Sequence, residues 1–433
     1  MIIQSRASLK AILPHDWLIS RLGLHGKFMS GSAFPDQFQG RCNEEIPFYK
    51  VADLARSSDG VHMPEPMHTI SDETRKRLKA KLIPKGSIVY AKIGAASLLN
   101  RRRVTTRSCC IDNNMTAFVP EQVSPEWALI WLRSLDFGAY MCPATVPSIS
   151  EGIQADLPLG LPPMEYEQRS IALLNERLPK IDKLITLLED KSSALSSYRQ
   201  SLITRAVTKG LDPNVEMKDS GVEWIGDIPK HWQISTLGRI GTFKGGDAFP
   251  VNLQGRSDNE ISFYKVANLG IHKESIYLKK SENTIAKEDA IALKANIINP
   301  GNIVYAKIGA ALLLNRRRIV NEPCCIDNNM TAFTLRTGNL LWAYYFLSTI
   351  DFGMYTCPAT VPSLSEGRQS QIPIAIPPMN EQIEIGEYIS SRLEKFQELY
   401  DSIIEMINNM KEYRSSLISA AVTGQLAIEE AEE

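Results

Sequence analysis

The sequence predicts two globular domains of mixed α/β (α+β) type, separated by two long helices that pair as a coiled coil. Three observations support this fold class. The chain repeats itself at a constant offset of 215 residues. Short segments of each copy alternate apolar and polar residues as strands do. Each copy ends in apolar residues at heptad spacing. The chain is therefore predicted to be an internal duplication.

The repeat extends over whole domains. IVYAKIGAASLLNRRR at 88–103 differs at one position from IVYAKIGAALLLNRRR at 303–318, and CCIDNNMTAF stands unchanged at 109–118 and 324–333. A period of this length is far beyond that of a solenoid repeat. Each copy is therefore a domain with an attached helical element.

Within each copy the elements follow in a predictable order. FYKVA and IVYAKIG alternate as short strands do, and PKG and NPG before the second strand are turn sequences. PEWALIWLRS (125–134) and GNLLWAYYFLST (338–349) have the pattern of a short amphipathic helix. The Asp-Phe-Gly triplets that follow are interpreted as a helix C-terminus with a glycine cap. Between the matched blocks, 55–87 and 270–302 share little sequence.

The last part of each copy is predicted to be helical, with an apolar stripe as narrow as that of a coiled coil. A single amphipathic helix docked on its own domain is the alternative. Pro179 lies inside the first stripe and is expected to kink or restart that helix. The heptad positions predicted to pair are Leu174, Ile181, Leu188, Leu195, Leu202, Ile389, Phe396, Ile403, Met410 and Leu417, with Ile171, Leu178, Ile185, Leu399, Met406, Tyr413 and Ala420 at the alternate positions.

These patterns give a predicted organisation in six parts. They are a first domain at 1–163, a first helix at 164–210, a polar connector at 211–226, a second domain at 227–378, a second helix at 379–424 and an acidic tail at 425–433.

The composition is that of an ordinary globular protein, with 44% hydrophobic and 22% charged residues in 433. The start MIIQSRASLK lacks the apolar run of a signal peptide, and no stretch approaches a membrane span. We expect a cytoplasmic protein. The net charge of −1 gives no global attraction to nucleic acid, so such binding must come from local patches.

The seven cysteines fit a reducing compartment better than a disulfide framework. Cys109–Cys110 and Cys324–Cys325 are directly adjacent and have no histidine beside them, which favours buried small hydrophobes over a zinc site.

The sequence lacks the motifs of the common catalytic sites, including GxxxxGK[ST], GxSxG, HExxH and an Asn-Pro-Pro-aromatic motif. A nuclease would need clustered carboxylates. Pro35-Asp36 with Glu44, Glu45 and Lys50 is a candidate, but Val251 replaces Asp36 in the second copy. His15 and His231 match between the copies beside a tryptophan and are interpreted as structural. We predict no catalytic residue and no metal site.

The repeated tract NRRR points to nucleic acid instead. Ile88–Arg107 and Ile303–Val320 carry several basic residues and no acidic one. Arginine matches phosphate and the guanine edge, whereas asparagine matches adenine. A solvated loop is the alternative, but both copies keep the tract while neighbouring segments diverge. The predicted DNA-binding residues are Lys50, Lys92, Asn100, Arg101, Arg102, Arg103, Asn113, Asn114, Lys265, Lys307, Asn315, Arg316, Arg317, Arg318, Asn328 and Asn329.

Over essentially its full length the chain resembles the specificity subunits of type I restriction–modification enzymes. The resemblance lies in TVPSISEGIQADLPLGLPPMEYEQ and TVPSLSEGRQSQIPIAIPPMNEQ, in the connector MKDSGVEWIGDIPKHW, and in AVTKG and AVTGQ where the helices end. Pro179 and the near identity of the two domains depart from the usual pattern of the family.

The resemblance implies two target recognition domains, each reading half of a bipartite site in double-stranded DNA, and two spacer helices that pair antiparallel. It further implies two modification methyltransferase subunits docked on the helices, and restriction subunits that translocate DNA. S-adenosylmethionine and Mg/ATP are then expected on those partner subunits, with no cofactor on this chain.

Two further readings stay open from the sequence alone: a duplicated scaffold that binds proteins only, and a self-sufficient nuclease with a cryptic metal site. If the family reading holds, antiparallel helices place two similar domains about a two-fold axis, which predicts an inverted repeat with an unread gap. Stripes of about 35 residues span on the order of 50 Å, and half-site centres are expected about 10 base pairs apart.

Overall fold

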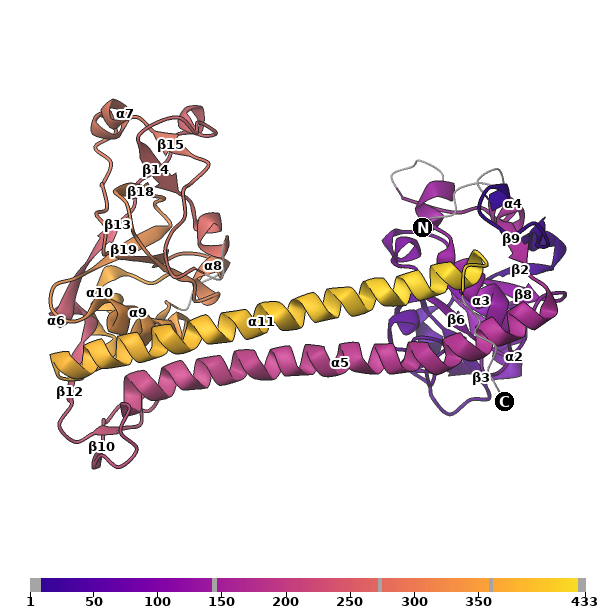
Figure 1. Cartoon of the computed structure of the whole chain (residues 1–433), viewed down its shortest axis with the longest axis horizontal. Helices are drawn as coiled ribbons and strands as arrows, with labels where there is room; N and C mark the ends of the chain where they lie inside the picture. The colour runs from indigo at the N-terminus through magenta and orange to yellow at the C-terminus, as the bar shows by residue number, and fades with distance from the viewer. Residues whose placement is uncertain (1–8, 142–145, 272–274, 358–360, 427–433) are drawn as a thin grey trace. The chain divides into compact units, whose positions relative to one another are not determined.

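The computed structural model describes residues 9–141, 146–271, 275–357 and 361–426 (Figure 1). The chain forms two compact units that do not follow the halves of the sequence. Unit 1 comprises Met1–Leu188 with Met406–Glu433, and unit 2 comprises Glu189–Glu405. Each unit therefore contains one copy of the globular domain, part of the first long helix and part of the second.

In unit 1 the domain is built on two sheets. The larger is antiparallel in the order β2-β8-β5-β6, and the smaller has the order β4-β3-β7 with β3 and β7 parallel. A separate pair, β1 with β9, joins the two ends of the domain. The strands are β1 (Leu18–Arg21), β2 (Gly26–Ser30), β3 (Ile46–Tyr49), β4 (Thr69–Ile70), β5 (Ile88–Ala91), β6 (Arg102–Val104), β7 (Cys110–Ile111), β8 (Met115–Pro120) and β9 (Pro158–Leu161). The helices are α2 (Asp72–Arg77), α3 (Pro125–Ser134) and α4 (Glu151–Asp156), with 3₁₀ turns at Leu22–Leu24, Asp36–Phe38, Val51–Ala55, Ala95–Leu99 and Phe137–Tyr140.

Unit 2 repeats this topology with sheets β13-β19-β16-β17 and β15-β14-β18 and the pair β12-β20. Its strands are β12 (Gln233–Thr236), β13 (Gly241–Gly245), β14 (Ile261–Tyr264), β15 (Thr284–Ile285), β16 (Ile303–Ala306), β17 (Arg317–Ile319), β18 (Cys324–Ile326), β19 (Met330–Leu335) and β20 (Pro373–Ile376). A hairpin of β10 (Met217–Asp219) in the connector and β11 (Asp227–Pro229) just after it precedes them. Its helices are α6 (Leu237–Ile240), α7 (Lys287–Ala292), α8 (Ala310–Leu313), α9 (Leu340–Thr349) and α10 (Glu366–Gln371), with 3₁₀ turns at Val251–Leu253, Val266–Gly270 and Phe352–Tyr355. The predicted mixed α/β class is confirmed.

Helix α3 forms where the sequence predicts a helix, but its surroundings differ from the expectation. Ser124 caps it by accepting from the backbone N–H of Trp127, and six consecutive residues from Trp127 to Leu132 are buried. The indoles of Trp127 and Trp131 donate to the carbonyls of Gly160 and Pro158. The helix is thus enclosed on all sides rather than amphipathic.

The Asp-Phe-Gly triplets do not end a helix with a glycine cap, as the sequence had suggested. Asp136 accepts from the backbone N–H of Gly138 at 2.9 Å and so begins the short 3₁₀ helix Phe137–Tyr140. Asp351 does the same for Phe352–Tyr355. Each carboxylate thus accepts from one free N–H group at the start of a helix, which is a local alternative to the glycine cap.

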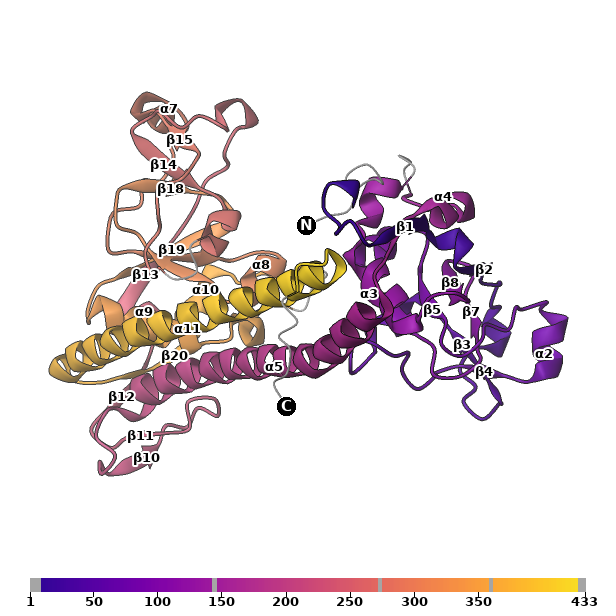
Figure 2. The same ribbon diagram turned by 45° about the vertical axis from the view of Figure 1, so that its right-hand side comes forward.

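In the described residues of the divergent segments 55–87 and 270–302, matching positions keep the same backbone features in spite of their different sequences. Lys79 and Lys294 both adopt positive φ, at 51° and 52°, and Ile83 and Ile298 both bridge to the first cysteine of a pair. Figure 2 shows the small sheet and α2 of unit 1 on the side of the domain away from α3 and the long helices. Figure 1 shows β14, β15 and α7 in the matching place in unit 2.

The two long helices are α5 (Met164–Lys209) and α11 (Met379–Val422), and they pair antiparallel within each unit. In unit 1 the Tyr166 hydroxyl donates to the carbonyl of Ala421, and Arg414 donates to Asp182. The predicted coiled coil is confirmed. Of the heptad positions Leu174, Ile181, Ile389, Ile403 and Leu417 are buried, and Leu188, Leu195, Leu202, Phe396 and Met410 are half-buried.

The helix register differs from the predicted stripe in one respect. Leu399, Met406 and Tyr413 are 45%, 50% and 45% exposed, whereas Ile407 is buried. Helix α5 also continues without interruption through Pro179. Proline has no N–H to donate to the carbonyl four residues earlier, and because Pro179 is exposed, water can hydrogen-bond that carbonyl instead. The helix does not restart there.

A candidate nucleic-acid interface

Four strand ends of the large sheet in unit 1 bring the predicted polar residues to a single edge. Across the sheet, Ser30 at the end of β2 pairs with Thr116, and Ala91 at the end of β5 pairs with Met115. Tyr90 pairs with Arg102 at the start of β6. The residues just beyond these positions, which include Asn114, Lys92 and Arg101, therefore lie along the same edge. We call this the strand-end edge.

The smaller sheet extends this edge to Lys50. Tyr49 pairs with Ile111, and the Tyr49 carbonyl accepts from the backbone N–H of Asp112, which opens the turn into β8. The Lys50 ammonium donates to the side-chain carbonyl of Gln39 at 2.7 Å. Lys50 is thus held in place beside the turn at 112–114, which carries Asn113 and Asn114 and which we call the asparagine turn.

The asparagine turn presents its amides outward. Asp112 accepts from the backbone N–H of Asn114 at 2.7 Å, and Asn113 and Asn114 are both exposed. Within the described ranges neither amide side chain makes a hydrogen bond. Both remain available to a base edge, where an amide pairs with adenine through two hydrogen bonds.

Lys92 lies in the middle of the edge and is partly withdrawn from water. Its ammonium donates to the Ser30 hydroxyl at 3.0 Å. Burial is the main cause that lowers the pKa of Lys92, and the nearby Lys81 lowers it further, while Glu151 opposes the shift. The ammonium group has therefore already lost part of its hydration.

Unit 2 builds the same edge from matching residues. Lys265 donates to Gln254 at 2.5 Å, and Asp327 orients the turn that carries Asn328 and Asn329. Within the described part of unit 2 neither of these amide side chains forms a hydrogen bond. Lys307 directly follows β16 as Lys92 directly follows β5.

The structure corrects the DNA-contact prediction for part of the arginine tract. Arg102 is 2% exposed, stacks over Phe137 at 3.9 Å and donates to the Leu135 carbonyl. Arg317 is equally buried against Phe352. Burial lowers the pKa of Arg102 to about 9 and that of Arg317 to about 10. Their guanidinium groups pack inside the domain and do not face solvent.

Other residues of the arginine tract also form hydrogen bonds within their own domain. Arg318 is buried and donates to the Arg317 carbonyl, while Arg103 is half-buried and donates to that of Arg102. Asn100 and Asn315 adopt left-handed φ values of 52° and 50°, a conformation that asparagine tolerates. The Asn100 amide donates to the Arg133 carbonyl at 2.7 Å. Asn315 accepts from the backbone N–H of Phe352. Both asparagines are therefore structural.

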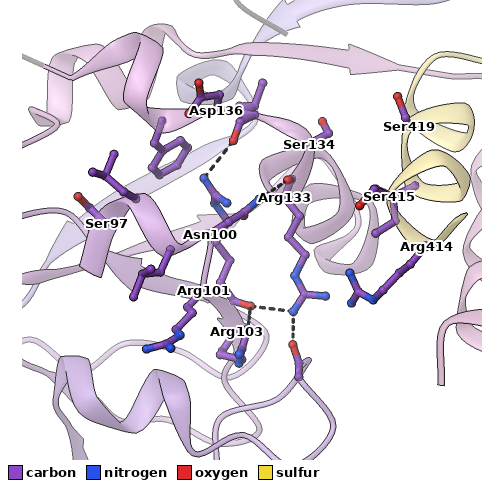
Figure 3. Close-up of a pocket in the computed structure, with 17 residues that line it drawn as sticks. Ser97, Asn100, Arg101, Arg103, Arg133, Ser134, Asp136, Arg414, Ser415 and Ser419 are labelled. Atoms are coloured by element: carbon purple, nitrogen blue, oxygen red, sulfur yellow. Dashed lines mark hydrogen bonds between the residues drawn. The ribbon is translucent and has the colours of Figure 1, made fainter. Parts of the chain in front are cut away.

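The exposed Arg101 opens onto a pocket of about 670 Å³ in unit 1, drawn in Figure 3. The pocket is lined by the arginine tract, by Arg133 from α3 and by Arg414 from α11. Arg133 donates to the Arg102 carbonyl at 2.8 Å, and Arg414 pairs with Asp182. Burial and the neighbouring Arg103 and Arg414 lower the pKa of Arg133 to about 10. Positive charge is concentrated in this hollow.

Unit 2 has a smaller pocket of about 240 Å³ at the same place, lined by Arg316–Arg318 and by Arg199 from α5. Arg199 and Arg414 are themselves separated by the repeat offset of 215. Sequence reasoning missed both because they lie in the helical segments. A search of those segments for matched cations would have found them.

The remaining sequence candidates have structural roles. Glu381 accepts from His231 at 2.6 Å and from the indole of Trp232. These bonds connect the segment just before β12 to the start of α11. Burial raises the pKa of the thiols of Cys109, Cys110 and Cys324 to about 12, so they stay protonated. In the described residues, no group of three or more His, Cys, Asp or Glu is placed to hold a metal ion. Within the same residues, no helix is long and apolar enough to span a membrane.

Comparisons with known proteins agree with this architecture. A family model described as the type I restriction modification DNA specificity domain matches residues 229–409. The chain is 21% identical over 441 residues to the MjaIX type I restriction enzyme specificity subunit of Methanocaldococcus jannaschii, covering 96% of this chain and 95% of that one.

Two solved structures share the fold. One is a chain from a study of complex assembly and conformational transition of a type I R-M system, with a TM-score of 0.72, 15% identity and coverage of 96% and 99% of the two chains. The other is the HsdS subunit of Thermoanaerobacter tengcongensis, with a TM-score of 0.51, 14% identity and coverage of 96% and 98%. The family model covers the second domain, and the first domain repeats that domain's matched blocks and its topology. The chain is therefore similar to type I restriction–modification specificity subunits over nearly its whole length, and its residues 229–409 match their DNA specificity domain.

Proposed function

We propose that this chain is the non-catalytic, DNA-reading subunit of a cytoplasmic type I restriction–modification complex. Residues 1–163 and 227–378 act as target recognition domains, each reading one half of a bipartite site in double-stranded DNA. The observation that carries this proposal is the strand-end edge, which presents the same ammonium and amide groups in both units. The near identity of those groups favours an inverted repeat with an unread gap.

Within each edge the residues divide the work by their chemistry. The free amides of Asn113 and Asn114, with Asn328 and Asn329, suit base edges in the major groove. Lysine and arginine suit phosphates, which hold the protein in register on the duplex. This role is proposed for Lys50, Lys92, Arg101, Lys265, Lys307 and Arg316.

The helices at 164–210 and 379–424 are proposed to space the domains and to dock two methyltransferase subunits. Besides the side chains that pair in the seam, α5 and α11 carry exposed apolar side chains. In unit 1 these include Leu184, Leu187 and Tyr413, at 50%, 54% and 45% exposure. Such side chains on a paired helix fit a protein interface better than solvent. The methyltransferase subunits are proposed to bring S-adenosylmethionine, and restriction subunits to bring Mg/ATP.

The test is to purify the chain with its methyltransferase partner and map methylated bases in DNA exposed to the complex. A single bipartite motif is expected, methylated only when this chain is present. Cleavage of DNA by the chain alone with Mg²⁺ would overturn the non-catalytic assignment. DNA binding that is equal for all sequences would overturn the reading function.

A double substitution tests the docking surface. Leu184→Glu with Leu187→Glu is expected to weaken association with the methyltransferase while the melting temperature stays unchanged, because both side chains are exposed. Lys183→Glu with Glu189→Lys, at exposed positions of the same helix, is the matched control. Equal methyltransferase binding by all three proteins would place the interface elsewhere.

A further inference from the structure

One pair of positions at the strand-end edge differs in charge between the two copies although its backbone is the same. Ser32 and Lys81 in unit 1 correspond to Asp247 and Asn296 in unit 2 at the offset of 215. Ser32 bridges Asp112, and its N–H donates to the Ile111 carbonyl at 2.9 Å. Asp247 makes the equivalent bridge and the equivalent 2.9 Å bond. The two pairs thus occupy the same site in the fold.

In unit 1 this site offers hydrogen-bond donors. The Ser32 hydroxyl accepts weakly from the backbone N–H of Lys81 at 3.4 Å and keeps its own proton free to donate. Lys81 is exposed and close enough to Lys92 for the two ammonium groups to repel each other. The site therefore places two positive charges beside the asparagine turn.

In unit 2 the same site offers a fixed acceptor. The two oxygens of the half-buried Asp247 carboxylate accept from the backbone N–H and the side-chain amide of Asn296, at 2.6 and 3.2 Å. These bonds hold the carboxylate in one orientation, and its remaining lone pairs have only acceptor capacity. The hydroxyl that holds Lys92 in unit 1 is also missing here, because Gly245 replaces Ser30.

We propose that this pair sets different base preferences in the two half-sites, which makes the target an imperfect inverted repeat. The proposal rests on the proposed DNA-reading function. An ammonium and a hydroxyl donate to the O6 and N7 acceptors of guanine, whereas a carboxylate accepts from the N4 amino group of cytosine and repels phosphate. The half-site read by unit 1 has guanine where the half-site read by unit 2 has cytosine, and the asparagine turns read their common positions.

The experiment exchanges the pair between the copies in the full chain, purified with its methyltransferase partner. The variant Ser32→Asp/Lys81→Asn/Asp247→Ser/Asn296→Lys keeps the net charge of the protein. It is expected to reverse the asymmetry of the methylated motif at one base pair in each half, with a preference change of roughly tenfold. The control variant Lys27→Thr/Thr242→Lys also keeps the net charge and exchanges a pair at the opposite end of β2 and β13.

The outcomes separate this inference from the proposed function. A wild-type motif with identical halves, or an exchange variant whose motif is unchanged, would overturn the inference and leave DNA reading in place. A wild-type complex that binds all DNA equally would overturn the proposed function itself. If the exchange variant is poorly folded, the variant Ser32→Asp/Lys81→Asn, which changes unit 1 only, takes its place. It must change the base preference in one half-site only. A uniform loss of affinity for all sequences refutes the assignment.

Discussion

The arginine tract of unit 1 places neighbouring residues in opposite roles, which makes it the sharpest test of the interface. Arg101 is exposed, and its guanidinium makes no hydrogen bond or ion pair within the described residues, whereas Arg102 is buried. We expect Arg101→Ala/Arg316→Ala to remove one phosphate contact in each half-site. Each lost contact makes the slope of log K against log salt shallower by about 0.9, so the double variant should lose about 1.8 units. The single variant Arg101→Ala should keep the wild-type melting temperature, because Arg101 is exposed.

Arg102→Met is expected to lower the stability of the protein and to leave the salt dependence of DNA binding unchanged. The substitution removes the stacking on Phe137, worth about 2 kcal/mol at a desolvated site, and the bond to the Leu135 carbonyl, worth about 1.5–3 kcal/mol. Against this, methionine no longer buries a charge, and it fills most of the same volume. We therefore expect a net loss of about 1 kcal/mol in the free energy of unfolding and no change in salt slope. Arg102→Ala should lose about 3 kcal/mol because it adds a cavity.

The assay is fluorescence anisotropy of the methyltransferase complex on duplexes with and without the mapped site, between about 50 and 200 mM salt. Urea unfolding of each variant gives the stability. If Arg102→Met makes the slope as shallow as Arg101→Ala does, the buried guanidinium reaches DNA. In that case the assignment of roles within the tract is wrong.

Three other expectations concern the helix seam, the asparagine turn and pH. Ile181→Asp should bury a charge in the seam and cost several kcal/mol, seen as lost assembly with the methyltransferase, whereas Glu176→Asp on the exposed face should assemble normally. Asn113→Ala/Asn328→Ala should lower affinity for the mapped site by roughly 1–3 kcal/mol per half and leave nonspecific binding unchanged; equal losses on both DNAs would contradict base reading. Burial raises the pKa of Cys109 to about 12 from an ordinary value of 9.0, so the unfolded chain releases the proton first. Stability is then complete below pH 9 and falls as pH rises above it, by about 1.4 kcal/mol per buried thiol at pH 10. Urea unfolding at pH 8 and pH 10 checks this, and Cys109→Ala should reduce the fall by that amount.

The fold followed from the sequence where the signal was local or repeated. The duplication is visible as identity at one offset, and the strands at IVYA and the helix at Pro125–Ser134 follow from short periodic patterns. The helical segments were found for the same reason. The register of α11 was less predictable, because an ideal helix drifts relative to a heptad, and Ile407 entered the seam where Met406 had been expected.

The site was predicted only in part, because burial depends on residues distant in sequence. Arg102 lies in a run that looks solvated until Phe137 is brought beneath it, and nothing within the tract shows which of its three guanidinium groups will be covered. The strand-end edge depends on which strands pair, and that is settled by the sheet order rather than by the tract. The role of Asn100 likewise depends on its backbone angle and on a carbonyl supplied by α3.

The division of the chain into Met1–Leu188 with Met406–Glu433, and Glu189–Glu405, has a consequence for synthesis on the ribosome. Unit 2 is continuous in sequence and can close as soon as Glu405 has emerged. Unit 1 begins with residues that are made before those of unit 2, yet Leu174 and Ile181 lack their partner helix until residues 406–422 appear. At about 5–20 residues per second, translation of the intervening segment takes roughly 10–40 s. The amino-terminal unit is thus the last to be completed, and a ribosome that stops early leaves its apolar helix face uncovered.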